Sequence, residues 1–121
     1  MKIIFSEKAP KPVEPYSQAV KTNRFLFVSG QLGIGPEGNV KGDIEDQTEQ
    51  CILNIKSILE KEGLTLKNVV KTTVYLKSID DFQKMNAIYE KYFIGKPARA
   101  CIGVGLIKDF KVEIEAIASY D

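Results

Sequence analysis

Hydrophobic and polar residues alternate in two stretches near the end of the chain, residues 97–104 and 111–118. A period of two is typical of β-strands that are buried on one face. The apolar side chains that share a face are Ala100, Ile102 and Val104 in the first stretch and Val112, Ile114, Ala116 and Ala118 in the second. If both apolar rows lie on one core, Arg99, Cys101 and Glu113 emerge together on the opposite face of the sheet.

An arginine and a glutamate on one sheet face are suited to binding and chemistry. The guanidinium of Arg99 can hold a carboxylate through two parallel hydrogen bonds, and Glu113 can transfer protons. Together they would bind an anionic small molecule and act on it. Taken alone, however, the two side chains are explained more simply as a surface ion pair between neighbouring strands, which is common on sheets.

Two stretches have the spacing of amphipathic helices. The first runs from residue 44 to 62, with Asp43 as its N-cap. Cys51 belongs to its apolar stripe, so we interpret this cysteine as a core residue rather than a nucleophile. The second runs from residue 81 to 93, and Asn86 lies at the edge of its stripe. A buried amide needs a hydrogen-bond partner, so Asn86 either braces a nearby loop or stays partly exposed.

Further strands are predicted at residues 2–5, 19–21, 25–28 and 69–77. The chain is therefore predicted to form a single α+β domain, residues 1–121, with a six-stranded mixed sheet and the order β-β-β-α-β-α-β-β. Two helices cover only one face of such a sheet. We expect the other face to pack against further copies of the chain, with a pocket between subunits, because it is too apolar to remain in water. The residues expected on this face are Tyr75, Arg99, Cys101, Glu113, Ile117 and a phenylalanine of residues 25–28.

Residues 33–38 match the pattern G-x-G-x-x-G of nucleotide-binding loops. That motif requires a helix that starts inside the loop. Here Pro36 interrupts the motif, and a second loop containing Gly42 follows it. We therefore interpret the stretch as an ordinary glycine-rich loop.

Composition and charge argue against several classes of protein. The chain has 17 basic and 16 acidic residues, a net charge of +1, whereas nucleic-acid-binding domains usually carry a basic excess on one face. It has no histidine, which excludes Ser-His-Asp and Cys-His catalysis and the usual zinc sites. Cys51 and Cys101 are far apart and are predicted to be free thiols. No stretch is long enough to span a membrane and the N-terminal apolar run is too short for a signal peptide, so we expect a cytoplasmic protein.

Seven short motifs, spread from one end of the chain to the other, occur together. They are PYSQAV at residues 15–20, FVSGQ at 27–31, DQT at 46–48, VYL at 74–76, MNAIY at 85–89, PARAC at 97–101 and VEIEAIA at 112–118. In this combination the chain resembles the Rid family, the reactive intermediate deaminases, and specifically the RidA-type branch. The pairing of PAR with IEAIA at this separation is specific.

The resemblance implies a homotrimer with a chorismate-mutase-like fold, whose sheets line a central barrel, whose helices face outward and whose clefts lie between subunits. It also implies a hydrolase that needs no metal or cofactor. Family members convert enamine and imine acids, such as 2-aminoacrylate, 2-iminopropanoate and 2-iminobutanoate, to 2-oxo acids and ammonia. These reactive intermediates leak from pyridoxal-phosphate enzymes, so the implied role is control of metabolite damage.

The same resemblance assigns roles to residues. Arg99 matches the arginine that holds the substrate carboxylate as a bidentate fork, a task suited to guanidinium. Glu113 matches the glutamate that positions or activates the attacking water. The positions that match substrate-binding or cleft residues are Tyr16, Ser29, Gly30, Asn86 and Cys101. The cysteine is expected to bind, not to act as a nucleophile.

The chain departs from the family pattern at two places, both expected near the pocket mouth. Glu14 precedes Pro15 where relatives commonly have glycine. The turn at residues 105–109 lacks the Arg-Leu-Pro sequence common there and is one residue shorter. These departures bear on substrate preference more than on activity.

Other functions stay open at this point. A non-enzymatic module would bind a small carboxylate metabolite in the same Arg99 cleft without turnover. An RNA-cleaving translation inhibitor is an activity also ascribed to relatives, although the near-neutral charge and the lack of histidine argue against it. A mutase acting on a cyclic dicarboxylate is suggested by fold alone, which is a poor guide to chemistry.

Overall fold

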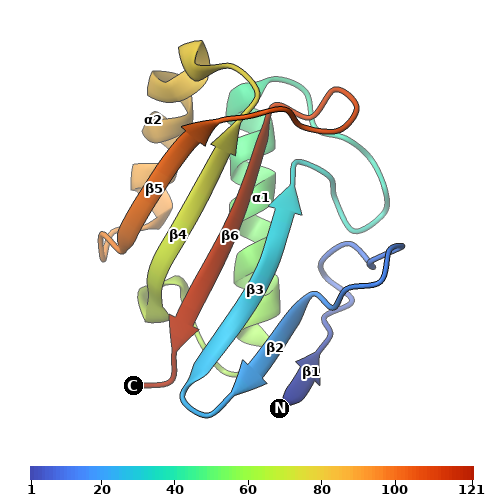
Figure 1. The fold of residues 1–121 in the computed structure, drawn as a ribbon, viewed down its shortest axis with the longest axis vertical. Helices are drawn as coiled ribbons and strands as arrows, with labels where there is room; N and C mark the ends of the chain where they lie inside the picture. Colours follow the sequence, from blue (N-terminus) through green and yellow to red (C-terminus); the bar gives the residue numbers. More distant parts are fainter.

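The computed structural model describes all 121 residues, and its six strands form one mixed sheet that two helices cover on a single face (Figure 1). The elements are β1 (Lys2–Ile4), β2 (Ala19–Thr22), β3 (Phe25–Leu32), α1 (Ile44–Glu60), β4 (Val69–Leu76), α2 (Phe82–Tyr92), β5 (Ala98–Gly103) and β6 (Val112–Ser119). Short 3-10 helices, η1 (Leu66–Asn68) and η2 (Ile79–Asp81), precede β4 and α2. The predicted α+β class and the order of the elements are confirmed.

The order of strands across the sheet is β1-β2-β3-β6-β4-β5. Only β4 and β5 run parallel, and every other neighbouring pair is antiparallel. β6 therefore lies in the middle of the sheet, and its alternate residues from Val112 to Ala118 are buried under α1. β5 is an edge strand, and β4 separates it from β6 (Figure 1). The two strands that follow each other at the end of the sequence are not neighbours.

The stripe predicted for α1 forms the centre of the core. Ile52, Ile55 and Ile58 are fully buried, together with Cys51, whose sulfur lies 3.7 Å from the Val112 carbonyl oxygen. The helix begins where Asp43 accepts a hydrogen bond from the Asp46 backbone N–H at 3.0 Å, as predicted for an N-cap. Cys51 is thus confirmed as a core residue.

The alternation predicted for β5 is confirmed, but the face assigned to its side chains is wrong. Arg99 points toward α2, whereas Ala100 and Ile102 lie on the uncovered face. Thr72, the residue opposite Arg99 on β4, is fully buried, which identifies this side as the helix-covered one. Cys101, two residues on, shares that side and packs against the core. At the sheet edge the aromatic rings and amide of α2 accommodate a guanidinium, so an apolar side chain is not required there.

The uncovered face carries many apolar side chains, as predicted, beside the charged Glu113 and Glu115, but Arg99 and Cys101 do not lie on it. Ile3, Phe27 and Ile102 are 62%, 43% and 46% exposed on it, and Ile117 is half-buried. Ile3, Val20, Phe27 and Ile117 follow one another across neighbouring strands. Packing of this face against other copies stays a prediction.

The glycine-rich stretch forms a loop and no helix starts inside it. Its only pairing is an isolated bridge between Ile34 and Val40, and α1 begins at Ile44, well past the last glycine of the motif. The prediction of an ordinary loop is confirmed.

Neither helix has the length and apolar content to cross a membrane.

Candidate functional site

The predicted site residues fall into two groups that the fold places on opposite faces of the sheet. The arginine group, from α2 and β5, consists of Asn86, Arg99 and Cys101. The glutamate group, from the segment before β2 and from β3 and β6, consists of Tyr16, Ser29, Gly30 and Glu113. Arg99 lies under α2, whereas Glu113 lies on the uncovered face, and β4 separates their strands. One chain therefore does not join the two groups into a single site.

Arg99 is held by side chains of α2. Its Nη1 donates a hydrogen bond to Asn86 Oδ1 at 2.6 Å. The guanidinium carbon lies 4.8 Å from the centre of the Tyr89 ring and 5.6 Å from that of Phe82. Asn86 is half-buried and braces a neighbouring strand's side chain rather than a loop.

No carboxylate neutralises Arg99 within the chain. The three ion pairs present join Lys2 and Lys21 to Glu62 and Arg24 to Asp121. An ion pair between Arg99 and Glu113, the simpler explanation of the sequence pattern, is therefore wrong. Arg99 is a half-buried cation with unused hydrogen-bond donors and no anion paired with it. Such a group is suited to binding the carboxylate or phosphate of a ligand.

Cys101 lies on the same face of β5, two residues from Arg99, and is half-buried. Burial raises the pKa of its thiol, and the positive charge of Arg99 opposes this effect. The group is therefore a thiol rather than a thiolate near neutral pH, which fits a wall of a binding site better than a nucleophile.

On the other face, an irregularity in β3 creates the space that Glu113 occupies. The register between β3 and β6 shifts between Val28 and Gln31, so Ser29 and Gly30 lie in a bulge. A Cβ atom at Gly30 would overlap Glu113 Oε2 and lie 2.9 Å from its Cδ. The absence of a side chain at Gly30 thus allows the carboxylate to lie against the β3 backbone.

Glu113 is half-buried and has an altered affinity for protons. Burial raises the pKa of its carboxyl group, and repulsion from Glu115, two residues along the same face of β6, raises it further. A carboxylate whose pKa is raised toward the working pH is a better general base than an ordinary surface glutamate.

The other two members of the glutamate group, Ser29 and Tyr16, are connected to Gly30 rather than to the carboxylate itself. Ser29 Oγ donates a hydrogen bond to the Ser17 carbonyl oxygen at 2.5 Å, and this bond ties β3 to the segment that carries Tyr16. Tyr16 is half exposed, and together with Gly30 it lines a small hollow of about 50 Å³. The apolar walls of the hollow include Leu32 and Ile34, so it is suited to a short aliphatic group.

Gln18 contributes to the site in a way that the sequence analysis misses. Its side chain is 2% exposed, and its Oε1 accepts a hydrogen bond from the Ser6 N–H at 2.6 Å. Its Nε2 donates to the carbonyl oxygens of Ser6 and Pro10 at 3.0 and 2.9 Å. These bonds fix the proline-rich segment that carries Tyr16. The sequence offers no periodic sign of this role, because Gln18 lies in an irregular segment just before β2.

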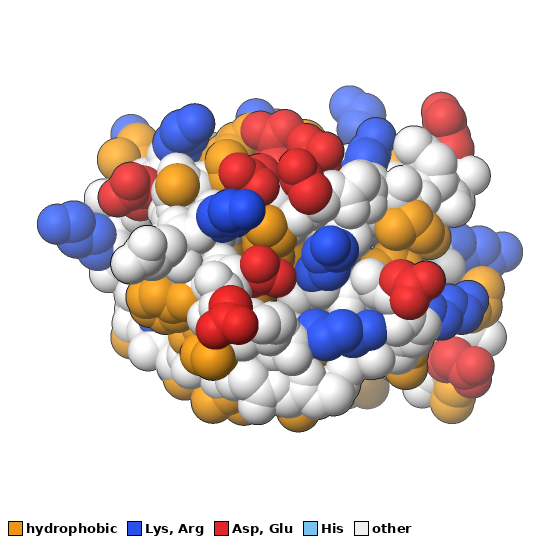
Figure 2. Space-filling model, turned by 90° about the horizontal axis from the view of Figure 1, so that it is seen from above, with side chains coloured by type: hydrophobic (Ala, Val, Ile, Leu, Met, Phe, Trp, Pro, Cys, Tyr) orange, Lys and Arg blue, Asp and Glu red, His pale blue; other side chains and the backbone are white.

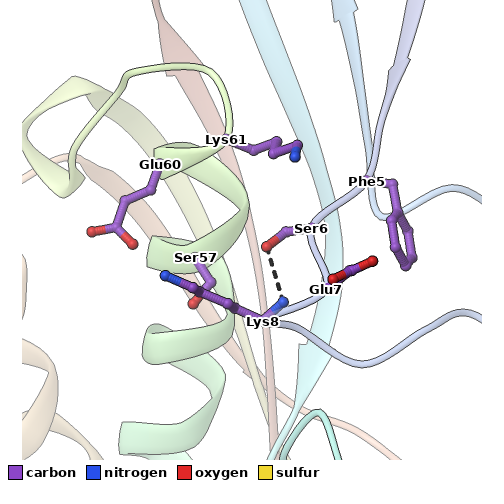
Figure 3. Close-up of a pocket in the computed structure, with 7 residues that line it drawn as sticks. All are labelled: Phe5, Ser6, Glu7, Lys8, Ser57, Glu60 and Lys61. Atoms are coloured by element: carbon purple, nitrogen blue, oxygen red, sulfur yellow. Dashed lines mark hydrogen bonds between the residues drawn. The ribbon is translucent and has the colours of Figure 1, made fainter.

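A larger hollow, about 450 Å³, lies elsewhere, between the segment after β1 and the last turns of α1 (Figure 3). Its lining residues are Phe5, Ser6, Glu7, Lys8, Ser57, Glu60 and Lys61. None of them is a predicted site residue, and only one is apolar. Nor do any three Cys, Asp or Glu side chains of the chain lie close enough together to hold a metal ion. The chemistry is concentrated in the arginine and glutamate groups.

Replacing Gly30 by alanine tests the placement of the Glu113 carboxylate. The new methyl group would meet the flexible end of Glu113, so we expect the fold to persist and the carboxylate to move. A displacement of this size lowers turnover by about 10- to 100-fold. The matched control is Gly95→Ala, because nothing lies within 4 Å of a Cβ at that position. Equal activity of the two variants, both with native unfolding free energies, would contradict the role of Gly30.

Comparison with known proteins finds similarity along almost the whole chain. The model of the family described as Endoribonuclease L-PSP matches residues 6–120. A RutC family protein of Pyrococcus abyssi is 56% identical over 120 residues, which cover 96% of this chain and 94% of the relative. The structure of the YjgF gene product from E. coli superposes with a TM-score of 0.96 at 40% identity, over all of both chains. The structure of E. coli TdcF with bound serine gives a TM-score of 0.96 at 35% identity, again over all of both chains.

Proposed function

The chain belongs to the Rid/YjgF family, whose family model bears the description endoribonuclease L-PSP, and from this premise we propose that it is a hydrolytic deaminase of enamine and imine acids. Its proposed substrates are 2-aminoacrylate, its tautomer 2-iminopropanoate, and 2-iminobutanoate. The products are 2-oxo acids and ammonia. The reaction needs only water and the side chains described above.

The observation that carries this proposal is the state of Arg99. It is a half-buried cation braced by a neutral amide, with no carboxylate partner in its own chain. Glu113 is its counterpart, a half-buried carboxylate with a raised pKa and no cation partner. A small acid with an electrophilic C=N carbon complements both, because its carboxylate pairs with Arg99 and its carbon accepts a water activated by Glu113.

The two groups lie on opposite faces of one sheet, so the proposed site forms between copies of the chain. The apolar uncovered face supports such assembly, since Ile3, Phe27 and Ile102 would otherwise remain in water. In the proposed trimer each cleft takes Arg99, Asn86 and Cys101 from one subunit and the glutamate group from its neighbour.

In the proposed reaction Arg99 binds the substrate carboxylate and orients the C=N carbon. Glu113 accepts a proton from a water molecule as the water oxygen bonds to that carbon, and then passes this proton to the nitrogen, which gives a tetrahedral carbinolamine. Transfer of the hydroxyl proton to the nitrogen and cleavage of the C–N bond then release ammonia and form the 2-oxo group. An enamine substrate first takes up a proton on carbon to become the imine. The small hollow beside Gly30 is suited to the one- or two-carbon side chain of these substrates.

Hydrolysis of freshly generated 2-iminobutanoate tests the proposal, with ammonia and 2-oxobutanoate release compared with the spontaneous rate. We expect clear acceleration by the purified wild-type protein, undiminished after treatment with a chelator. Assembled wild-type protein that gives no rate above the spontaneous one would overturn the deaminase.

Two alternatives each have a specific observation in their favour. The bound serine in the neighbour from E. coli, TdcF, favours a module that binds a small amino or oxo acid without turnover. The name of the family model favours RNA cleavage. Against RNA binding, acidic and basic side chains are intermixed over the end of the sheet seen in Figure 2, and the net charge is +1. A metal-free ribonuclease assay, with the Arg99→Ala variant beside the wild type, separates these functions.

The pH dependence of the proposed reaction should report the raised pKa of Glu113. Protonated Glu113 cannot accept a proton from water, so kcat/KM should fall as the pH falls through the pKa of Glu113. This fall should occur at a higher pH than for an ordinary glutamate, whose pKa is about 4.3. Replacing Glu115 by glutamine removes one of the two causes of the raised pKa. The fall in kcat/KM on the acid side of the profile should therefore remain but occur at a lower pH. Profiles that coincide for wild type and Glu115→Gln would contradict this assignment.

A further inference from the structure

Arg99 is enclosed by more than its hydrogen bond to Asn86. We propose that Phe82, Tyr89 and Thr72 are positioning residues that hold the Arg99 guanidinium ready for a carboxylate before the ligand arrives. This inference rests on the proposed role of Arg99 as the carboxylate anchor. None of the three belongs to the arginine group defined above, and none touches the reacting atoms in the proposed reaction.

The three contacts from α2 come from one face of the helix. Phe82, Asn86 and Tyr89 are spaced by four and three residues, so they project from the same side of the helix, and all three contact Arg99 of β5. The ribbon in Figure 1 shows α2 lying along β5. Both rings lie within the distance at which an aromatic ring attracts a cation. The guanidinium is thus confined by two rings and by one hydrogen bond.

Tyr89 is itself fixed by the strand beside Arg99. Its hydroxyl lies 2.7 Å from Thr72 Oγ1, and both residues are buried, with exposed fractions of 7% and 0%. Thr72 lies on β4 directly opposite Arg99 of β5. The hydrogen bond therefore ties the Tyr89 ring to the strand next to the one that carries Arg99. The Tyr89 ring also packs against Phe93, with centroids 4.5 Å apart. The ring therefore has little freedom to move away from the guanidinium.

All partners of Arg99 are uncharged, so its positive charge stays available for a ligand carboxylate. An aspartate in place of Asn86 would neutralise the guanidinium, and a ligand carboxylate would then have to displace it. The neutral amide takes one donor and leaves the remaining N–H groups and the full charge available. Holding the side chain in place beforehand reduces the ordering cost that binding would otherwise carry.

The test breaks the Tyr89–Thr72 hydrogen bond from either side, with Tyr89→Phe and Thr72→Val. Both substitutions nearly preserve the side-chain volume, and Tyr89→Phe also keeps the aromatic ring. We expect each to weaken binding of 2-oxobutanoate, measured by titration calorimetry, by about fivefold, the worth of one hydrogen bond. KM for 2-iminobutanoate should rise by the same factor, with a smaller change in kcat. The double variant should be no worse than either single one, because one bond is lost in all three.

Matched controls separate positioning from stability. Tyr92→Phe removes a hydroxyl on the same helix, which donates to Glu49 at 2.6 Å on the exposed side, and should leave binding unchanged. Asn86→Asp should weaken 2-oxobutanoate binding by at least about tenfold, because the added carboxylate competes for Arg99. Thermal unfolding is recorded for every variant.

The results distinguish this inference from the proposed function. Unchanged binding and KM in both Tyr89→Phe and Thr72→Val, even with lower unfolding temperatures, would show a purely structural role and overturn it. Absence of Arg99-dependent binding of 2-oxobutanoate by the wild type would overturn it as well. If the wild type does not accelerate hydrolysis, yet its binding weakens as expected in these variants, the deaminase fails and the positioning role stands.

Discussion

Replacing Arg99 by alanine should lower kcat/KM for 2-iminobutanoate by about 10²- to 10⁴-fold, because the variant loses both the charge that binds the substrate carboxylate and the geometry that orients the C=N carbon. Arg99→Lys should recover only part of the loss, since an ammonium group cannot form the two parallel hydrogen bonds of a guanidinium. The measurement is the release of 2-oxobutanoate from freshly generated imine, corrected for spontaneous hydrolysis.

The chain offers a matched control for this experiment. Arg24 is the only other arginine, and its exposed side chain pairs with Asp121 at the end of the chain, away from both groups. Arg24→Ala should keep wild-type turnover. Near-normal hydrolysis by Arg99→Ala, with the assembly intact, would exclude Arg99 as the carboxylate anchor and leave the proposed mechanism without its first step.

The second large effect is a recovery of activity on mixing two inactive variants. Arg99→Ala and Glu113→Ala, each assembled alone, have no cleft with both groups and should be inactive. When the two chains are co-expressed and the mixed trimers are purified with two different tags, about one third of the clefts should pair an intact Arg99 with an intact Glu113, because each mixed trimer has one such cleft. Activity should therefore return to about a third of the wild-type value.

This recovery depends on the placement of the two residues. If one chain supplied both, every cleft of a mixed assembly would still lack one of them, and activity would stay at background. Such a result would contradict a site shared between subunits. The control mixes Arg99→Ala with wild type, where the loss of activity should follow the fraction of variant chains.

The sequence predicts most of the fold because its signals are local. The alternation in residues 112–118 and the apolar stripe around Cys51 and Ile55 follow directly from periods of two and of 3.6 residues, and both are confirmed. The N-cap at Asp43 is equally local, since it depends on one side chain and the backbone three residues on.

The errors concern relations between distant segments. Period-two alternation shows that Arg99 and Ala100 point to opposite sides but not which side α2 covers. That depends on β4 lying between β5 and β6, which no pattern within either strand encodes. The same insertion of β4 removes the expected ion pair with Glu113.

The assignment of the candidate site residues stays a prediction, and their arrangement is new information from the fold. The resemblance to a known family supplies all seven members of the two groups, but not their division between the two faces of the sheet. Periodicity in the sequence does not predict the bulge at Ser29 and Gly30 or the buried amide of Gln18. Both depend on which segments meet in the folded chain.

The opposite orientation of Arg99 and Glu113 has a genetic consequence. In the proposed trimer every chain serves two clefts, one through each face of its sheet. A chain altered at Arg99 alone would disable one cleft in a mixed trimer with two normal chains. A chain altered at both positions would disable two of the three. In a cell that expresses both alleles equally, the doubly altered allele should therefore leave about a quarter of the clefts intact, whereas the singly altered allele should leave about half.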